Sequence, residues 1–170
     1  MCVIIFKPAG RALPSARTLF RCYATNRDGM GFATPTSVYH SMRYEDFFEA
    51  VQKVPKADPC IIHFRWATHG SVRLENCHPF VKGNVVFAHN GVLPIQPIGD
   101  MTDSETAFKT IVYPAIQEHG FRSEKANEII EATAQGSRFA IMVGKDVQLV
   151  GNWHYMNGIY YSNLNWCRYM

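Results

Sequence analysis

The feature that most constrains the fold is an unbroken apolar run near the start of the chain. Residues 2–6 read Cys-Val-Ile-Ile-Phe, without the polar alternation of a strand that has one face in water. Such a run predicts a strand that is covered on both faces. Pro8 and Gly10 follow it and indicate a turn. The chain must therefore supply packing layers on both sides of this strand.

The same run places a cysteine directly after the initiator methionine. If Met1 is removed, Cys2 carries both a thiol and a free α-amine, and the amine can act as the base for its own side chain. A thiol titrates near about 8.5 and an α-amine near about 7.7–8.0, so both can exchange protons close to neutral pH. The structural alternative is a small apolar residue that begins a buried strand, and position alone favours it.

The rest of the chain alternates between helical and strand patterns. Helices are predicted from Pro14 to about residue 24, over 44–53, from Thr102 onward with a kink or restart at Pro114, and around 126–130. Strands are predicted as a pair near 30–42, over 60–66, over 85–88, and as a meander from Phe139 onward. Residues 70–80 are predicted to form a polar loop. Strands on both sides of central helices predict sheets that pack together with helices outside.

Composition limits the class of protein. The 170 residues are 47% hydrophobic and 18% charged, which predicts one folded domain. A net charge of +3 with scattered basic residues predicts neither nucleic acid nor a membrane surface as a partner. No apolar stretch has transmembrane length, and the start does not read as a signal peptide. Five unpatterned cysteines indicate a reducing compartment, so we expect a cytoplasmic protein.

Residues 60–66 alternate with the period of a strand. One face is predicted to carry Ile61, His63 and Arg65, and the other Ile62, Phe64 and Trp66. An arginine at the end of this strand offers a planar fork that suits a carboxylate. Thr68 and His69, just beyond it, could donate to the same anion. The structural alternative is a surface ion pair followed by two ordinary loop residues.

Two further polar clusters lie at predicted element boundaries. His89-Asn90-Gly91 follows a buried strand, where a side-chain amide and a glycine N–H could form an oxyanion hole. Asn-Gly is also typical of a hairpin turn, and both interpretations can hold at once. Asp103 stands in the first turn of a predicted helix, either as a partner of the helix dipole or as a carboxylate that recognises an ammonium group.

Taken together, these groups describe one ligand. Arg65 suits a carboxylate, Asp103 an ammonium, and Asn90 with Gly91 a developing oxyanion, while Cys2 supplies the nucleophile. A carboxylate, an ammonium and an attackable carbonyl are the parts of an amino acid with a side-chain amide.

An ordered set of motifs resembles that of class II glutamine amidotransferase domains, which are N-terminal-nucleophile hydrolases. The motifs are Met1-Cys2, DGMGFA at 28–33, RWATHG at 65–70, NCHPF at 76–80, HNG at 89–91 and DSE at 103–105. Any one of them is weak, but the ordered set is specific. The resemblance implies an α+β fold, a four-layer αββα sandwich with the N-terminal cysteine on an inner strand.

The resemblance also implies hydrolysis of glutamine to glutamate and ammonia through a thioester on the N-terminal cysteine. The residues expected to act in catalysis are Cys2, Asn90 and Gly91. The residues expected to bind the zwitterion are Arg65, Thr68 and His69 at the α-carboxylate and Asp103 at the α-ammonium. Trp66 and His78 also match motif positions and are expected to shape the loops around the site. No cofactor and no metal are implied.

The sequence departs from the family pattern in four places. Val3 follows the cysteine where many members have glycine, and the stretch from Asn90 to Asp103 is short, which predicts a more open pocket edge. The last 65 residues carry no recognised motif. The 170 residues leave no room for a synthase domain. We therefore expect a single domain over 1–170 without an attached synthase, which passes ammonia to a separate synthase partner.

Other interpretations stay open at this point. A different amide hydrolase of the same N-terminal-cysteine type would use Cys2 with another acyl pocket. If Met1 is retained, the chain is better interpreted as a catalytically silent glutamine-binding or regulatory module. A metal site is disfavoured because the spacing of its candidate ligands is irregular; these are Cys60, His63, His69, Cys77 and His78. Late aromatics are predicted to pack the last strands, with a docking surface as the alternative; these are Tyr155, Tyr160, Tyr161, Trp166 and Tyr169.

Overall fold

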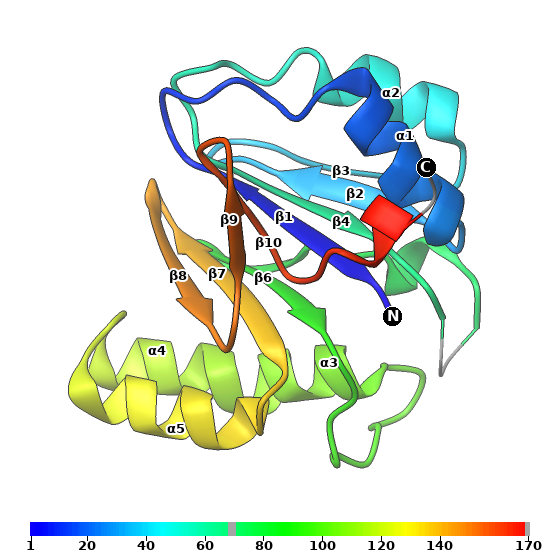
Figure 1. The fold of residues 1–170 in the computed structure, drawn as a ribbon. Helices are drawn as coiled ribbons and strands as arrows, with labels where there is room; N and C mark the ends of the chain where they lie inside the picture. Colours follow the sequence, from blue (N-terminus) through cyan, green and yellow to red (C-terminus); the bar gives the residue numbers. More distant parts are fainter. Residues whose placement is uncertain (68–70, 169–170) are drawn as a thin grey trace.

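Two antiparallel sheets pack face to face between two layers of helices in the computed structural model, which describes residues 1–67 and 71–168 (Figure 1). The six-stranded sheet has the order β3-β2-β4-β1-β10-β9, and the four-stranded sheet has the order β5-β6-β7-β8. This arrangement confirms the expected αββα sandwich. Thr68, His69 and Tyr169, which the sequence singled out, lie outside the described residues.

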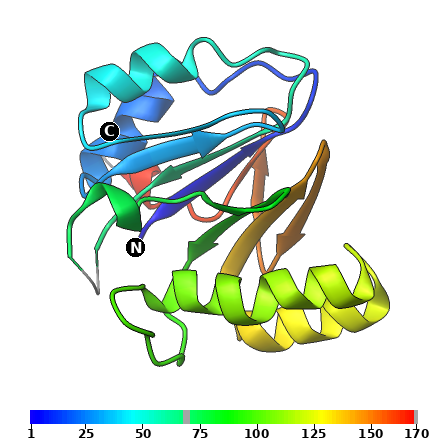
Figure 2. The ribbon, with the colours of Figure 1, turned by 180° about the vertical axis from the view of Figure 1, so that it is seen from behind.

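The chain forms most of the six-stranded sheet first, then the four-stranded sheet, and returns to the six-stranded sheet with its last two strands. The six-stranded sheet contains β1 (Val3–Lys7), β2 (Met30–Ala33), β3 (Val38–Ser41), β4 (Cys60–Phe64), β9 (His154–Met156) and β10 (Ile159–Tyr161). The four-stranded sheet contains β5 (Phe80–Lys82), β6 (Val85–Asn90), β7 (Arg138–Val143) and β8 (Asp146–Val150). The helices are α1 (Ala16–Thr25), α2 (Tyr44–Val51), α3 (Asp103–Ala107), α4 (Tyr113–His119) and α5 (Glu124–Ala134), with short 3-10 turns at Leu74–Asn76 and Asn165–Arg168. Helices α1 and α2 cover one sheet, and α4 and α5 cover the other (Figure 2).

Strand β1 lies inside the six-stranded sheet and pairs antiparallel with β4 and with β10. Val3 and Ile5 pack beneath α1 and α2, whereas Ile4 packs between the two sheets. All three side chains have no exposed surface. The prediction that the first apolar run is covered on both faces is therefore confirmed.

Strand β4 shows the predicted alternation. Ile61 packs between the sheets, while Ile62 and Phe64 pack beneath the helices. Residues on one face of a strand point to one side, so a period of two sorts this strand between two different cores. The alternation also directs His63 toward the facing sheet, where its ring centroid lies 4.4 Å from that of His78.

The middle helices begin and change where the local sequence predicts. The Thr102 side chain accepts a hydrogen bond from the Glu105 N–H at 3.1 Å and caps α3. A π-helical turn, Phe108–Val112, then joins α3 to α4, and Pro114 is the second residue of α4. Because proline lacks an N–H, a regular α-helical ladder is interrupted at that position. The change of helix type lies directly before Pro114, where a kink or restart was predicted.

The prediction of a polar loop over 70–80 is wrong for its second half. Asn76, Cys77, His78, Pro79 and Phe80 are all buried, and Phe80 already belongs to β5. The segment passes close to β2, where a side chain at residue 31 would overlap the carbonyl oxygen of residue 78, so only glycine fits there. Contacts with segments distant in the sequence bury this stretch, and such contacts cannot be predicted from a local sequence pattern.

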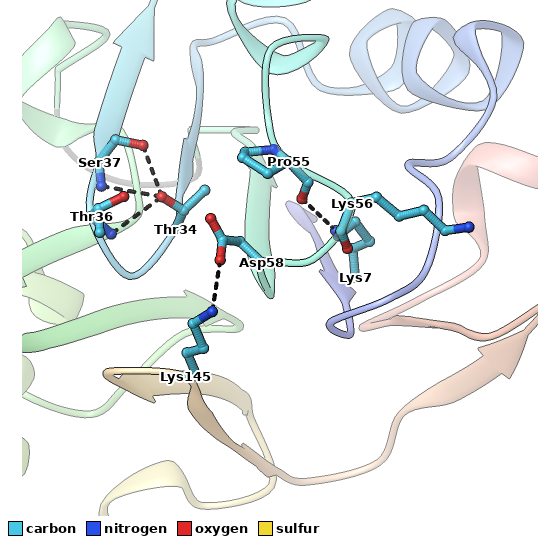
Figure 3. A network of polar contacts seen from close by, with 8 residues as sticks. All are labelled: Lys7, Thr34, Thr36, Ser37, Pro55, Lys56, Asp58 and Lys145. Carbon is cyan, nitrogen blue, oxygen red and sulfur yellow. Dashed lines mark hydrogen bonds and ion pairs between the residues drawn. The ribbon is translucent and has the colours of Figure 1, made fainter.

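A group of polar contacts lies at the end of β1 away from Cys2 (Figure 3). The buried Lys7 ammonium donates to the carbonyl oxygens of Pro55 at 3.2 Å and Lys56 at 3.0 Å, and burial lowers the pKa of Lys7. The Lys145 ammonium pairs with the Asp58 carboxylate at 3.2 Å. Asp58 precedes β4 and Lys145 lies between β7 and β8, so this ion pair links the two sheets.

Three histidines are buried among the described residues. His63 and His78 lie against each other, with ring centroids 4.4 Å apart, whereas His89 lies on the helix-facing side of β6, against Phe139. Burial lowers the pKa of His63 to about 3 and that of His89 to about 4, and it holds the pKa of His78 well below its usual value. Among the described residues, neither ring nitrogen of His78 has a hydrogen-bond partner. The folded protein therefore holds these imidazoles neutral, whereas the unfolded chain protonates them below about pH 6.5.

The linkage between protonation and folding gives a testable pH dependence. Between about pH 6.5 and 4 the unfolded state binds more protons than the folded state. The free energy of unfolding should therefore decrease as the pH is lowered, by up to about 1.4 kcal/mol per pH unit for each histidine. His78→Leu removes one buried imidazole and should flatten this slope by up to about 1.4 kcal/mol per unit. His154→Leu alters an exposed histidine and is the matched control. Urea unfolding across this window measures the slopes, and an unchanged slope in His78→Leu would contradict the interpretation.

Candidate active site

Most of the predicted site residues converge on one cavity beside the N-terminal end of β1. The sequence-predicted residues that line it are Cys2, Arg65, Trp66, His78, Gly91 and Asp103. Asn90 does not line it, and Thr68 and His69 lie outside the described residues. The lining residues to which the sequence analysis gave no role in the site are Ala67, Asn76, His89, Thr102 and Ser104. Each of these lies within or beside one of the recognised motifs, so proximity to a motif was the signal that could have found them.

The Cys2 thiol lies against the backbone of the loop after β4. Its Sγ accepts a hydrogen bond from the Trp66 N–H at 3.3 Å and lies 3.4 Å from the Trp66 carbonyl oxygen. Burial raises the pKa of the Cys2 thiol, while the Trp66 hydrogen bond, the N-terminal ammonium and Arg65 act in the opposite direction. Because burial dominates, the thiol needs a base before it can attack at neutral pH.

Arg65 is held at the end of β4 by its backbone as well as its side chain. Its N–H donates to the Gly29 carbonyl oxygen at 2.8 Å, and its carbonyl accepts from the Asp28 N–H at 3.0 Å. Asp28 also accepts a hydrogen bond from the Ala67 N–H at 2.8 Å. The guanidinium is buried, and its Nη1 donates to the Ser71 carbonyl oxygen at 3.1 Å. The first residues of the DGMGFA motif thus hold the backbone around Arg65 in place, a role that the sequence pattern alone did not reveal.

Asp103 anchors the loop that follows β6 to the first turn of α3. Its Oδ2 accepts from the Leu93 N–H at 2.9 Å, and its Oδ1 accepts from the Ser104 N–H at 2.7 Å. A carboxylate has about four acceptor positions, so these bonds leave capacity for an ammonium group. The structural and the binding interpretations of Asp103 are therefore compatible.

A short hydrogen-bonded chain joins β6 to the same carboxylate. The Ser104 hydroxyl lies 2.7 Å from His89 Nδ1 and donates to Asp103 Oδ1 at 3.2 Å. The Asp103 charge partly offsets the effect of burial, which lowers the pKa of His89 to about 4. His89 is thus a neutral imidazole that fixes the helix start against the strand that carries Asn90.

Asn90 and Gly91 are both set by close packing. The Asn90 side chain is buried, and its Nδ2 donates to the Ser162 hydroxyl at 2.8 Å, while its Oδ1 has no partner among the described residues. Gly91 has φ +152°, and a Cβ there would overlap the hydroxyl of Ser137. Only glycine therefore fits at this turn.

The space between the lining side chains is small. It amounts to about 40 Å³, close to the roughly 30 Å³ that one water occupies in the liquid. A larger pocket of about 460 Å³ adjoins it, lined mainly by the 92–97 loop and Met101, and shares Thr102 and Asp103 with it. No cluster of three or more potential metal ligands occurs in residues 1–67 and 71–168. In those same ranges no helix is long and apolar enough to cross a membrane.

Comparison with known proteins connects this geometry to a family. The family model for class II glutamine amidotransferases matches residues 31–146. A Haemophilus influenzae protein named provisionally as a glutamine amidotransferase is 49% identical over 61 residues, which are 28% of this chain and 20% of that protein. A glutamine–fructose-6-phosphate aminotransferase from Zymomonas mobilis is 34% identical over 71 residues, covering 41% of this chain and 10% of that protein. The matches thus span only a minor part of these relatives.

A comparison with solved structures identifies a protein of similar fold. The allosteric regulatory enzyme of purine biosynthesis superposes with a TM-score of 0.56 and 16% identity, over 95% of this chain and 41% of its own. At this identity the likeness supports the fold alone, whereas the family model covers more than half of the chain. The chain belongs to the class II glutamine amidotransferase family.

Proposed function

We propose that this protein hydrolyses glutamine to glutamate and ammonia through a thioester on Cys2. The observation that carries the proposal is the convergence of a thiol, a buried guanidinium and a carboxylate on one cavity, at Cys2, Arg65 and Asp103. Arg65 would bind the α-carboxylate, with help from Thr68 and His69, and Asp103 would bind the α-ammonium. The remaining end of the substrate, its amide, would then lie toward the thiol.

The chemistry follows from the groups at the N-terminus. After removal of Met1, the α-amine of Cys2 takes the thiol proton, and the sulfur attacks the side-chain carbonyl carbon of glutamine. The Asn90 amide and the Gly91 N–H would stabilise the resulting oxyanion. The protonated amine then gives its proton to the departing ammonia, and water hydrolyses the thioester. Trp66 and His78 would hold the walls of the site.

The destination of the ammonia is the next part of the proposal. Relatives from Zymomonas mobilis and Buchnera aphidicola are named as glutamine–fructose-6-phosphate aminotransferases, so in those proteins nitrogen from glutamine reaches a sugar phosphate. We infer that this chain passes ammonia to an acceptor on a separate synthase partner. The five cysteines are all free, which supports a reducing, cytoplasmic setting for this chain.

A second candidate is another amide hydrolase that uses the same N-terminal cysteine. The apolar pocket of about 460 Å³ beside Asp103 favours it, because that pocket could hold an apolar group attached to the substrate. Glutamine itself has no such group. If Met1 stays in place, the α-amine belongs to Met1, and the chain would bind glutamine without hydrolysing it.

Replacement of the nucleophile tests the proposed reaction. Processed Cys2→Ala and Cys2→Ser proteins should lose glutamate release by about 10³-fold or more, because no sulfur remains to form the thioester. Cys167→Ser changes another partly buried thiol and should keep full activity. Mass spectrometry with a glutamine analogue that carries a diazoketone in place of the amide should find one adduct, on Cys2. Full activity of Cys2→Ala would exclude the mechanism.

Recognition of the zwitterion can be tested from the substrate side. Asp103→Asn should lower kcat/KM for glutamine by about 10- to 100-fold, through the loss of a charge-assisted hydrogen bond, but should hardly affect glutaramate, which lacks the ammonium. Glu105→Gln, two residues further on and paired with Lys109 at 2.6 Å, is the matched control. Equal losses of kcat/KM on both substrates would show that Asp103 only anchors the loop and does not bind the ammonium. Faster cleavage of an amide with an apolar substituent than of glutamine would favour the second candidate.

A further inference from the structure

The chain segment directly after β10 reaches the site although it carries no recognised motif. Ser162 has no exposed surface and Asn163 is 7% exposed. Strand β10 runs antiparallel beside β1, with Ile5 opposite Tyr161 (Figure 1). The next two residues of the chain, Ser162 and Asn163, therefore lie beside the first residues of β1, the strand that Cys2 directly precedes.

Ser162 joins three backbone and side-chain groups. Its N–H donates to the Ile4 carbonyl oxygen at 2.9 Å, and its hydroxyl oxygen accepts from the Ile4 N–H at 2.8 Å. The same hydroxyl accepts from Asn90 Nδ2 at 2.8 Å. Asn90 belongs to the four-stranded sheet and Ile4 to the six-stranded one, so one hydroxyl holds the asparagine amide and the nucleophile strand in a fixed relation.

Asn163 holds the nucleophile residue itself. Its Nδ2 donates to the Cys2 carbonyl oxygen at 2.7 Å, and its Oδ1 accepts from the Asn165 N–H at 3.1 Å. Its own carbonyl oxygen accepts from the Trp166 indole N–H at 3.1 Å. Because both ends of the Asn163 amide are engaged, its orientation is fixed, and the peptide plane after Cys2 is fixed with it.

We propose that Ser162 and Asn163 are positioning residues of the active site, Ser162 for the Asn90 amide and Asn163 for Cys2. This inference rests on the proposed function. Ser162 takes up one N–H of the Asn90 amide and thereby sets the plane in which the second N–H is presented. Asn163 sets the orientation of the residue that holds both the thiol and, after processing, its amine. Catalysis depends on such fixed geometry, since small misplacements of reacting groups cost large factors in rate.

The effect of Ser162 should pass through Asn90. Ser162→Ala should lower kcat for glutamine by about 10-fold or more with less than about 2-fold change in KM, because the Ser162 hydroxyl bonds Ile4 and Asn90 and not a group proposed to bind the zwitterion. Asn90→Ala should lower kcat by about 10²–10³-fold. In the double variant the two losses should not multiply. Ser41→Ala removes another buried hydroxyl that bonds the backbone, at Arg43, and should leave kcat unchanged.

The role of Asn163 is tested by the order of two replacements. Asn163→Asp keeps an acceptor for the Asn165 N–H but turns an oxygen toward the Cys2 carbonyl oxygen, whereas Asn163→Ala loses both bonds. A positioning role predicts that Asn163→Asp is at least as impaired as Asn163→Ala. A role only in shaping the turn predicts that Asn163→Asp is the better of the two. The readouts are glutamine turnover and the rate of Cys2 alkylation by iodoacetamide, followed by peptide mass spectrometry.

These measurements separate the inference from the function on which it rests. A wild-type protein without glutaminase activity would overturn the proposed function, while the order of the alkylation rates would still decide the role of Asn163. A wild-type protein that hydrolyses glutamine, together with multiplying losses for Ser162→Ala and Asn90→Ala, or with an unimpaired Asn163→Asp, would overturn the positioning inference alone.

Discussion

The burial of β1 on both of its faces is the constraint on which the rest of the structure depends. Val3 and Ile5 fill the core beneath α1 and α2, and Ile4 fills the space between the sheets. A strand in this position cannot shift by one residue without exchanging these two cores. Cys2 directly precedes this strand, so the packing that stabilises the fold also determines where the thiol lies. A site built on a rigid element is held more precisely than one on a loop.

Polar groups bridge the two sheets at both ends of β1, but they differ in kind. The Lys145–Asp58 pair is partly exposed and contributes about 0–1 kcal/mol. The bond from Asn90 to Ser162 is buried, and the net contribution of such a bond is about 1 kcal/mol. Burying one Ile or Met side chain between the sheets contributes about 1.5–3 kcal/mol. The apolar interface therefore holds the sheets together, while the buried polar bond defines how they align at the site.

Features with a local period could be predicted from the sequence, and features made by distant contacts could not. The buried first strand and the alternation over 60–66 follow from side-chain periodicity, and both are confirmed. The buried segment 76–80 passes close to Gly31, which is distant in the sequence, and a hydrogen bond of Ser162 joins residues 158 positions apart. For the site, the ordered motifs predicted residues that do line one cavity, such as Cys2, Arg65 and Asp103. The pairing of β10 with β1, which brings the motif-free end of the chain to Cys2, leaves no local pattern.

The environment of Cys2 also explains why processing would control its reactivity. Burial raises the pKa of the thiol, and the Trp66 N–H and Arg65 only oppose that effect. While Met1 is attached, the nitrogen of Cys2 is an amide and cannot accept the thiol proton. Removal of Met1 turns that nitrogen into an amine within the same residue, which supplies a base and, once protonated, a positive charge that favours the thiolate. Under the proposed mechanism, β1 thus holds the thiol in position, and removal of Met1 would supply the base that the thiol needs.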